Sequence, residues 1–136
     1  MTDWQSALEA VAADYTRGTL ERDARAISEA YRLKTGEGKR LLTRESEAAA
    51  YALSRMPATV EAARAALAEA LEASGLAPRT MLDCGAGTGT VTFAADSLLA
   101  LKRATCLERE AAMRAVGQRL MAEAGGVQAQ WAACDL

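Results

Sequence analysis

Three glycines recur at alternate positions in the segment LDCGAGTGT, residues 82–90. The segment follows a short apolar run and precedes a helix-length stretch, and Asp83 lies two positions before the first glycine, Gly85. Because glycine has no Cβ, its main chain lets a ligand come close, and amides at the start of a following helix favour a carboxylate or a phosphate. The segment therefore predicts a cofactor-binding loop at the carboxyl end of a strand.

The spacing of the glycines discriminates between cofactors. A dinucleotide fingerprint, GxGxxG, requires a glycine at position 90, where this chain has Thr90. A P-loop requires a lysine directly after its last glycine, and Gly89 is followed by threonine. The remaining pattern, DxGxGxG, is that of the loop that binds S-adenosylmethionine in class I methyltransferases. We therefore predict cofactor contacts from Asp83, Gly85, Gly87 and Gly89.

Two further acids follow the next two apolar runs. Glu108 lies at the predicted end of a second strand, where a carboxylate can accept hydrogen bonds from both hydroxyls of a ribose. Asp135 lies just past a third predicted strand, where it can accept from an adenine amino group. The alternatives are a generic turn at the glycines and a helix cap at Asp135. Acids at the ends of three adjacent strands favour the cofactor site.

Histidine is absent from the chain, which excludes His-based triads and the usual zinc sites. The three cysteines, Cys84, Cys106 and Cys134, form no CxxC pair and fit a reducing compartment. They fall at or near the predicted strand ends, and we interpret them as small apolar residues packed under helices rather than as a metal or redox cluster. We expect no metal site, and no residue qualifies as a catalytic candidate.

The composition is that of a globular protein, with 51% apolar and 25% charged residues in a chain of 136. Neither a signal-peptide pattern nor an uncharged apolar run of about 18 residues is present, so we expect a cytoplasmic protein that does not span a membrane. The net charge of −2 does not indicate a nucleic-acid binder. Residues 17–44 have an excess of basic side chains that could contact phosphate, although solvated helix faces are the preferred interpretation.

Helical periodicity dominates the first part of the chain. Apolar stripes at helical spacing comprise Trp4, Leu8, Val11 and Tyr15, and then Leu20, Ala24, Ile27 and Tyr31. The stripes predict two amphipathic helices that pack together, followed by a break at residues 36–38.

Two more helices are predicted before the glycine loop. Thr43 is the predicted cap of a third helix that ends near Met56, and Pro57 separates it from a fourth helix. Gly75 ends the fourth helix in a left-handed conformation. We therefore predict a helical subdomain over residues 1–77.

After this point, short apolar runs alternate with helix-length segments. The predicted elements are a strand over 81–84, a helix over 90–102, a strand over 104–107, a helix over 110–124 and a strand over 127–134. Right-handed crossovers arrange three such strands as a parallel sheet in the order 3-2-1, the first half (βαβαβ) of a Rossmann-like α/β fold. We assign residues 78–136 to the N-terminal half of a cofactor-binding domain.

The first predicted strand would form an edge of this half sheet. In a complete fold of this type a fourth strand lies beside it, and an open apolar edge favours association. We therefore hypothesise that the chain is the N-terminal part of a longer protein, or that self-association with another copy covers the edge.

The whole chain resembles the N-terminal part of the small-ribosomal-subunit methyltransferase-like family, the mitochondrial ribosome assembly factors and their bacterial relatives. The resemblance rests on AYALSRMPATVEAARAAL at 50–67, LDCGAGTGT at 82–90 and CLEREAAM at 106–113. The run Arg55-Met56-Pro57-Ala58-Thr59 is its most specific part, because all class I methyltransferases share the glycine loop. Cys84, Thr88 and Glu110 depart from the family pattern.

The resemblance implies a binding site for S-adenosylmethionine. The implied contacts are the methionine end for Asp83, Gly85, Gly87 and Gly89, the ribose for Glu108 and the adenine for Asp135. It also implies a role in small-subunit ribosomal RNA methylation or in ribosome assembly. Two functions stay open, a methyltransferase that acts on ribosomal RNA and a non-catalytic assembly factor that binds pre-ribosomal RNA. A third, a nicotinamide-dependent oxidoreductase, is disfavoured by Thr90.

Overall fold

The computed structural model describes residues 3–32 and 42–136. The predicted helix break at 36–38, together with Lys34, Lys39 and Arg40, lies outside the described residues. The elements in chain order are α1 (Trp4–Ala12), α2 (Arg17–Arg32), α3 (Glu45–Ser74), β1 (Thr80–Cys84), α4 (Thr90–Asp96), β2 (Arg103–Leu107), α5 (Ala111–Ala124) and β3 (Ala129–Ala132). The predicted fold class, a helical region followed by a βαβαβ half of a Rossmann-like fold, is confirmed.

The three strands form a parallel sheet in the spatial order β1-β2-β3, as the sequence predicts. Cys84 pairs with Leu107, and Leu107 pairs with Ala132, so the three carboxyl ends meet at one edge of the sheet. β1 has β2 as its single neighbour among the described residues, and covering of its other edge by a second copy stays a prediction.

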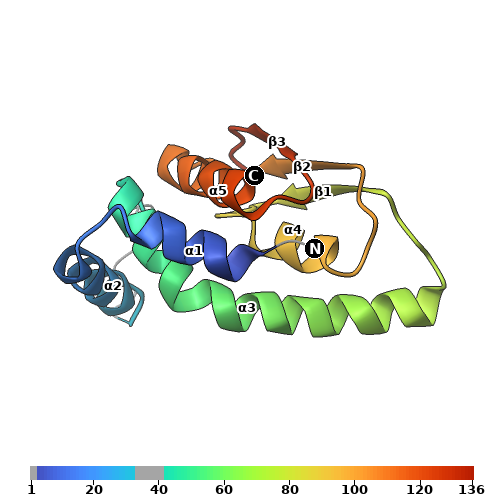
Figure 1. Ribbon diagram of the computed structural model, residues 1–136, viewed down its shortest axis with the longest axis horizontal. Coiled ribbons are helices and arrows are strands. Elements are labelled where there is room, and N and C mark those ends of the chain that lie inside the picture. The colour runs from blue at the N-terminus through green and yellow to red at the C-terminus, as the bar shows by residue number, and fades with distance from the viewer. Residues whose placement is uncertain (1–2, 33–41) are drawn as a thin grey trace.

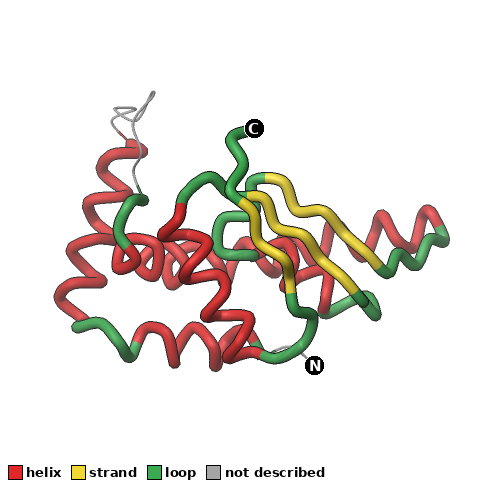
Figure 2. The backbone as a smooth tube through the Cα atoms, turned by 90° about the horizontal axis from the view of Figure 1, so that it is seen from above, coloured by secondary structure: helices red, strands yellow, loops and turns green. Residues whose placement is uncertain are grey.

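The sheet is covered by helices on one face, and no described helix covers the other (Figures 1 and 2). Side chains of a strand alternate between faces, and Asp83, Ala104 and Cys106 are buried toward the helices. On the opposite face Leu82 is 60% exposed and Cys84 is exposed. The interpretation of the cysteines as packed residues is therefore correct for Cys106 and wrong for Cys84.

α1 and α2 do not pack against each other as predicted. Among the described residues α1 packs chiefly on α5, and α2 packs on α3. Arg119 of α5 forms an ion pair with Asp14, just after α1, while the buried Asp23 of α2 accepts a hydrogen bond from Arg44 beside α3 at 3.3 Å. The apolar stripes predict that both helices are buried, but they do not specify the partner of each.

Among the described residues, one apolar core extends from the N-terminal helices into the α/β part. Val11 of α1, Val60 of α3 and Val116 of α5 all belong to it and are almost fully buried. The proposed boundary between residues 77 and 78 stays a prediction. No helix within the described ranges is long and apolar enough to cross a bilayer.

The predicted third and fourth helices are one helix, α3, which continues through Pro57. Proline removes one backbone hydrogen bond, here to the carbonyl of Leu53. Pro57 is exposed, so water can satisfy that carbonyl, while Met56 and Val60 are each 1% exposed and anchor the helix on both sides of the proline. Burial of these side chains outweighs the proline, which explains why the predicted break does not occur.

The ends of α3 follow local capping rules. The N-cap is Arg44, one residue after the predicted Thr43, and its amide donates to Glu47 Oε1 at 3.0 Å. Gly75 ends the helix with a φ of 68°, as predicted, and its amide donates to the carbonyl of Leu71.

Pro57→Ala should stabilise the protein by about 1–3 kcal/mol, because alanine restores the missing helical hydrogen bond and removes the steric conflict. Urea denaturation measures the change. Pro78→Ala is the matched control. Pro78 lies in an exposed connection, so its loss should leave stability unchanged or lower it slightly through the unfolded state. A lower free energy of unfolding for Pro57→Ala would contradict the description of α3 as one helix that continues through the proline.

Candidate functional site

A hollow of about 200 Å³ lies at the carboxyl ends of the strands. Its lining comprises Gly85, Glu108, Arg109, Cys134, Asp135 and Leu136. Three of the six predicted cofactor-binding residues, Gly85, Glu108 and Asp135, are therefore brought together. They come from the ends of β1, β2 and β3, which the parallel register places side by side.

Glu108 is held in place by two backbone amides. Its Oε1 accepts from the amide of Gly87 at 3.1 Å, and its Oε2 accepts from the amide of Glu110 at 2.7 Å. A carboxylate offers about four acceptor positions, so about half remain for the hydroxyls of a ligand. The side chain of Glu108 is thus oriented before any ligand binds.

The three glycines of the loop have different structural roles. All have positive φ, 71° at Gly85, 59° at Gly87 and 91° at Gly89. A Cβ on Gly85 would meet nothing within 4 Å, whereas a Cβ on Gly89 would lie 2.7 Å from Cε of Met121. Gly85 therefore leaves open space at the hollow, while Gly89 lets the loop pack closely against α5.

Four amides of the loop donate to acceptors within the protein. Those of Gly85 and Ala86 both donate to the carbonyl of Leu107 at 2.9 Å, and that of Gly89 donates to the carbonyl of Ala86 at 2.8 Å. The amide of Gly87 is bound by Glu108. These four amides therefore already have acceptors within the protein.

Asp83 does not line the hollow but lies under α4. It is 8% exposed, and its Oδ2 accepts from the hydroxyl of Thr92 at 2.8 Å. Burial raises the pKa of Asp83, and the hydrogen bonds from Thr92 oppose the rise. The same hydroxyl lies 3.5 Å from Sγ of Cys106, and burial raises the pKa of that thiol to about 11. Asp83 fixes α4 to the sheet in this structure.

Asp135 and Arg109 lie at the mouth of the hollow. Asp135 is 79% exposed, and its Oδ1 lies 3.8 Å from Nη1 of Arg109. An exposed ion pair of this length contributes little to stability. The carboxylate of Asp135 can therefore leave Arg109 and accept a hydrogen bond from a ligand with little loss of stability.

Several residues that shape the site do not belong to the predicted set. Gly117 of α5 lies against Trp131 of β3, and a Cβ there would collide with the indole. Arg114 donates to the carbonyls of Glu108 at 2.6 Å and of Arg109 at 2.9 Å. A glycine inside a helical pattern signals a close contact, so Gly117 could have been found from the sequence, whereas Arg114 carries no such signal.

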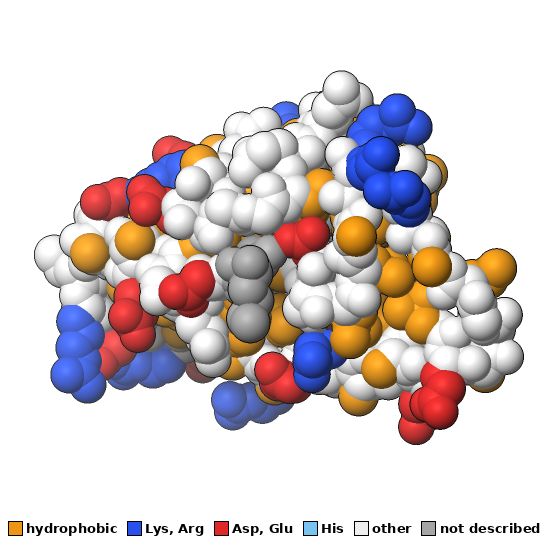
Figure 3. Space-filling view, turned by 45° about the vertical axis from the view of Figure 1, so that its right-hand side comes forward, with side chains coloured by type: hydrophobic (Ala, Val, Ile, Leu, Met, Phe, Trp, Pro, Cys, Tyr) orange, Lys and Arg blue, Asp and Glu red, His pale blue; other side chains and the backbone are white. Residues whose placement is uncertain are grey.

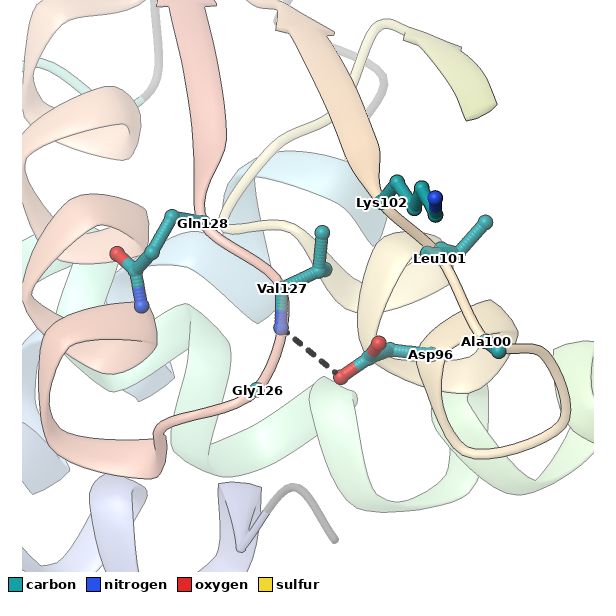
Figure 4. Close-up of a pocket in the computed structure, with 7 residues that line it drawn as sticks. All are labelled: Asp96, Ala100, Leu101, Lys102, Gly126, Val127 and Gln128. Carbon is teal, nitrogen blue, oxygen red and sulfur yellow. Dashed lines mark hydrogen bonds between the residues drawn. The ribbon is translucent and has the colours of Figure 1, made fainter. Parts of the chain in front are cut away.

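A larger hollow of about 490 Å³ lies at the opposite end of the sheet (Figure 4). Its lining includes Asp96, Lys102, Val127 and Gln128. Asp96 points across it and accepts from the amide of Val127 at 3.2 Å. None of the predicted cofactor-binding residues lies there, so the smaller hollow is the candidate site.

The fold and the glycine loop define this chain as a helical region joined to the first half of a Rossmann-like α/β unit. Residues 45–136 match the family described as mitochondrial small ribosomal subunit Rsm22. This match covers more than half of the chain, and the protein belongs to that family. No curated protein matches the sequence.

Replacing Gly89 by alanine should destabilise the protein more than replacing Gly85. Both variants place a Cβ at positive φ, which costs about 1–2 kcal/mol. Gly89→Ala also places its Cβ 2.7 Å from the terminal methyl of the buried Met121, and moving this flexible side chain should add less than the roughly 1–3 kcal/mol of overpacking a rigid neighbour. Chemical denaturation compares the two. Equal losses would show that the loop does not pack on α5 as described.

Asp83→Asn should change how stability depends on pH. Because the pKa of Asp83 is raised in the folded state, its contribution to stability is complete below the unfolded pKa and is lost as pH rises through the folded pKa. The free energy of unfolding of the wild type should therefore fall relative to that of the variant as pH rises above about 4. Urea denaturation across a pH series tests this.

Asp3→Asn is a control of opposite sign. The hydrogen bonds from Ser6 lower the pKa of Asp3 in the folded state. The contribution of Asp3 to stability is therefore present above the unfolded pKa and is lost as pH falls through the folded pKa. Parallel pH profiles for the two variants would contradict the burial of Asp83.

Proposed function

We propose that this chain holds the adenosyl part of S-adenosylmethionine and belongs to a methyltransferase-like protein that acts on small-subunit ribosomal RNA. The observation that carries the proposal is the meeting of Gly85, Glu108 and Asp135 at one hollow. Open backbone lies beside two carboxylates there, each on a different strand end. Hydroxyl and amino donors of an adenosyl group complement such acceptors.

The charge of the hollow favours a ligand without phosphate. Glu108 and Asp135 are both acids, and Arg109 is the one cation among the described residues of the lining. A dinucleotide would bring a pyrophosphate near these carboxylates, and four loop amides, those of Gly85, Ala86, Gly87 and Gly89, already have acceptors. S-adenosylmethionine carries a sulfonium cation instead, so the electrostatics disfavour the nicotinamide alternative.

Each residue has a defined task in the proposed site. Glu108, held by the amides of Gly87 and Glu110, would bind the ribose, and Asp135 would accept from the adenine. Gly85 would allow close approach of the methionine end. When bound, the cofactor supplies an electrophilic methyl group, and transfer requires a nucleophile in line with it at about 3–3.5 Å. We assign no catalytic residue.

The family supplies the proposed partner. Its description places it with the small ribosomal subunit, and we extend that association to this chain. Ribosomal RNA is then the acceptor in the methyltransferase proposal and the ligand in the alternative.

A non-catalytic assembly factor is the second candidate function. The hollow of about 200 Å³ is smaller than the roughly 300–1,000 Å³ of typical small-molecule pockets. This volume favours a partial site, in which a bound cofactor stabilises the fold or acts as a sensor without methyl transfer.

Calorimetric titration of S-adenosylmethionine into the chain tests the proposal. Asp135→Ala and Glu108→Ala should each weaken binding roughly 10- to 150-fold, because each removes a hydrogen bond to a charged acceptor. Glu123→Ala is the matched control, an exposed acid on α5 that does not line the hollow. The Asp135 variant is the sharper test, because Glu108 also holds the loop.

The controls separate the candidate functions. Tighter binding of NAD than of S-adenosylmethionine would overturn the cofactor assignment. Saturable binding of S-adenosylmethionine followed by transfer of its labelled methyl group to small-subunit ribosomal RNA would support the enzyme. Binding without labelled RNA would support the assembly factor instead.

A further inference from the structure

Three basic residues meet at the amino ends of β1 and β2. Arg79 directly precedes β1, and Lys102 and Arg103 stand at the start of β2. The carbonyl of Arg79 accepts from the amide of Lys102 at 2.7 Å and from that of Arg103 at 3.4 Å. Two separate segments thus bring three cations together, and we call Arg79, Lys102 and Arg103 the basic rim.

The basic rim is exposed and has no ion pair with an acid among the described residues. Elsewhere, five described arginines pair with carboxylates, namely Arg17, Arg22, Arg44, Arg109 and Arg119. Arg25 and Arg55 also have no ion pair within the described ranges, but the rim brings three such cations together from two separate segments. Figure 3 shows positive side chains gathered at the upper right, on the side where β1 and β2 begin. Asp96 lines the adjoining hollow together with Lys102, and its carboxylate accepts from the amide of Val127. The three cations of the rim outnumber this acid, and the excess of positive charge favours an anionic ligand.

The rim lies at the opposite end of the sheet from the proposed cofactor hollow. β1 has five residues, and a strand rises about 3.3 Å per residue, so roughly 16 Å of strand separate the two regions. The larger hollow adjoins the rim, because Lys102 lines it (Figure 4). The rim and the larger hollow therefore lie at the same end of the sheet, opposite the proposed cofactor hollow.

We propose that the basic rim binds the phosphodiester backbone of RNA. The inference rests on the proposed function, which makes ribosomal RNA the partner of this chain. Arginine matches phosphate with paired donors, and lysine adds a compact charge. Contacts of this kind orient RNA without reading its sequence. The rim would anchor the RNA away from the position at which the cofactor is held.

The basic segment at residues 17–44 is a less favourable surface for RNA. Within its described part, Arg17 pairs with Glu21 at 2.7 Å, and Arg44 pairs with Glu47 at 3.0 Å. These acids reduce the phosphate-attracting field of the segment. The segment nevertheless provides a matched control for the rim.

Fluorescence anisotropy with a labelled, unstructured oligouridine across a salt series tests the proposal. The rim variant R79Q/K102Q/R103Q should bind at least about tenfold more weakly than the wild type. Its slope of log affinity against log salt should be smaller by about 2, because each phosphate contact on a single strand contributes about 0.7. The α2 variant R17Q/R25Q/R32Q removes the same charge from exposed side chains and should bind like the wild type.

Two further variants separate charge from fold. R79K/R103K keeps the charge and should retain most of the affinity. The single variant K102Q should reduce the slope by about 0.7, which preserves the test should the triple variant fold poorly. Circular dichroism and S-adenosylmethionine titration on each variant report whether the fold and the proposed cofactor site are intact.

The outcomes distinguish the two proposals. RNA binding that is unchanged in the rim variant but weakened in the α2 variant would overturn the rim and leave the proposed function standing. Absence of RNA binding by the wild type would remove both the rim and the ribosomal RNA partner. Rim-dependent binding to phosphatidylserine vesicles without RNA binding would assign the rim to a membrane surface instead.

Discussion

The carboxylate of Glu108 is the contact on which the candidate site depends. It accepts from the amide of Gly87 in the loop after β1 and from the amide of Glu110 at the start of α5. One side chain at the end of β2 therefore fixes the position of two neighbouring segments. Backbone amides that would otherwise attract an anion are satisfied by this acid, so the site acquires acceptors rather than donors. In the proposed site, Glu108 would therefore favour a ligand that donates hydrogen bonds.

The α/β part could be predicted closely from the sequence because its determinants are local. Gly85, Gly87 and Gly89 are required by positive φ, and parallel strands follow from right-handed crossovers. Strand order then places Glu108 and Asp135 at the same edge without further information. The boundaries differ by a few residues. α4 ends at Asp96 rather than 102, where the hydroxyl of Ser97 bonds to the carbonyl of Ala94 and the chain turns toward β2.

The helical region was less predictable because its determinants are tertiary. Pro57 signals a helix end locally, yet burial of Met56 and Val60 keeps α3 continuous. The stripe of α1 shows that Val11 is buried but not that α5 covers it. Asp83 poses the same problem, since the motif indicates a site residue while the side chain lies under α4 on Thr92. The periodicity of apolar residues predicts which side chains are buried. Which element each of them packs against depends on the tertiary structure.

The two ends of the sheet carry opposite charge, and this polarity suits a protein with two dissimilar ligands. Acids gather where the strands end, at Glu108 and Asp135, whereas the basic rim lies where β1 and β2 begin. RNA phosphates would be repelled from the acidic edge and attracted to the basic one. A single fold could then orient RNA along the sheet while the cofactor hollow stays free of phosphate. The net charge of −2 does not reveal this arrangement, because it is a sum over the acidic and basic residues of the whole chain.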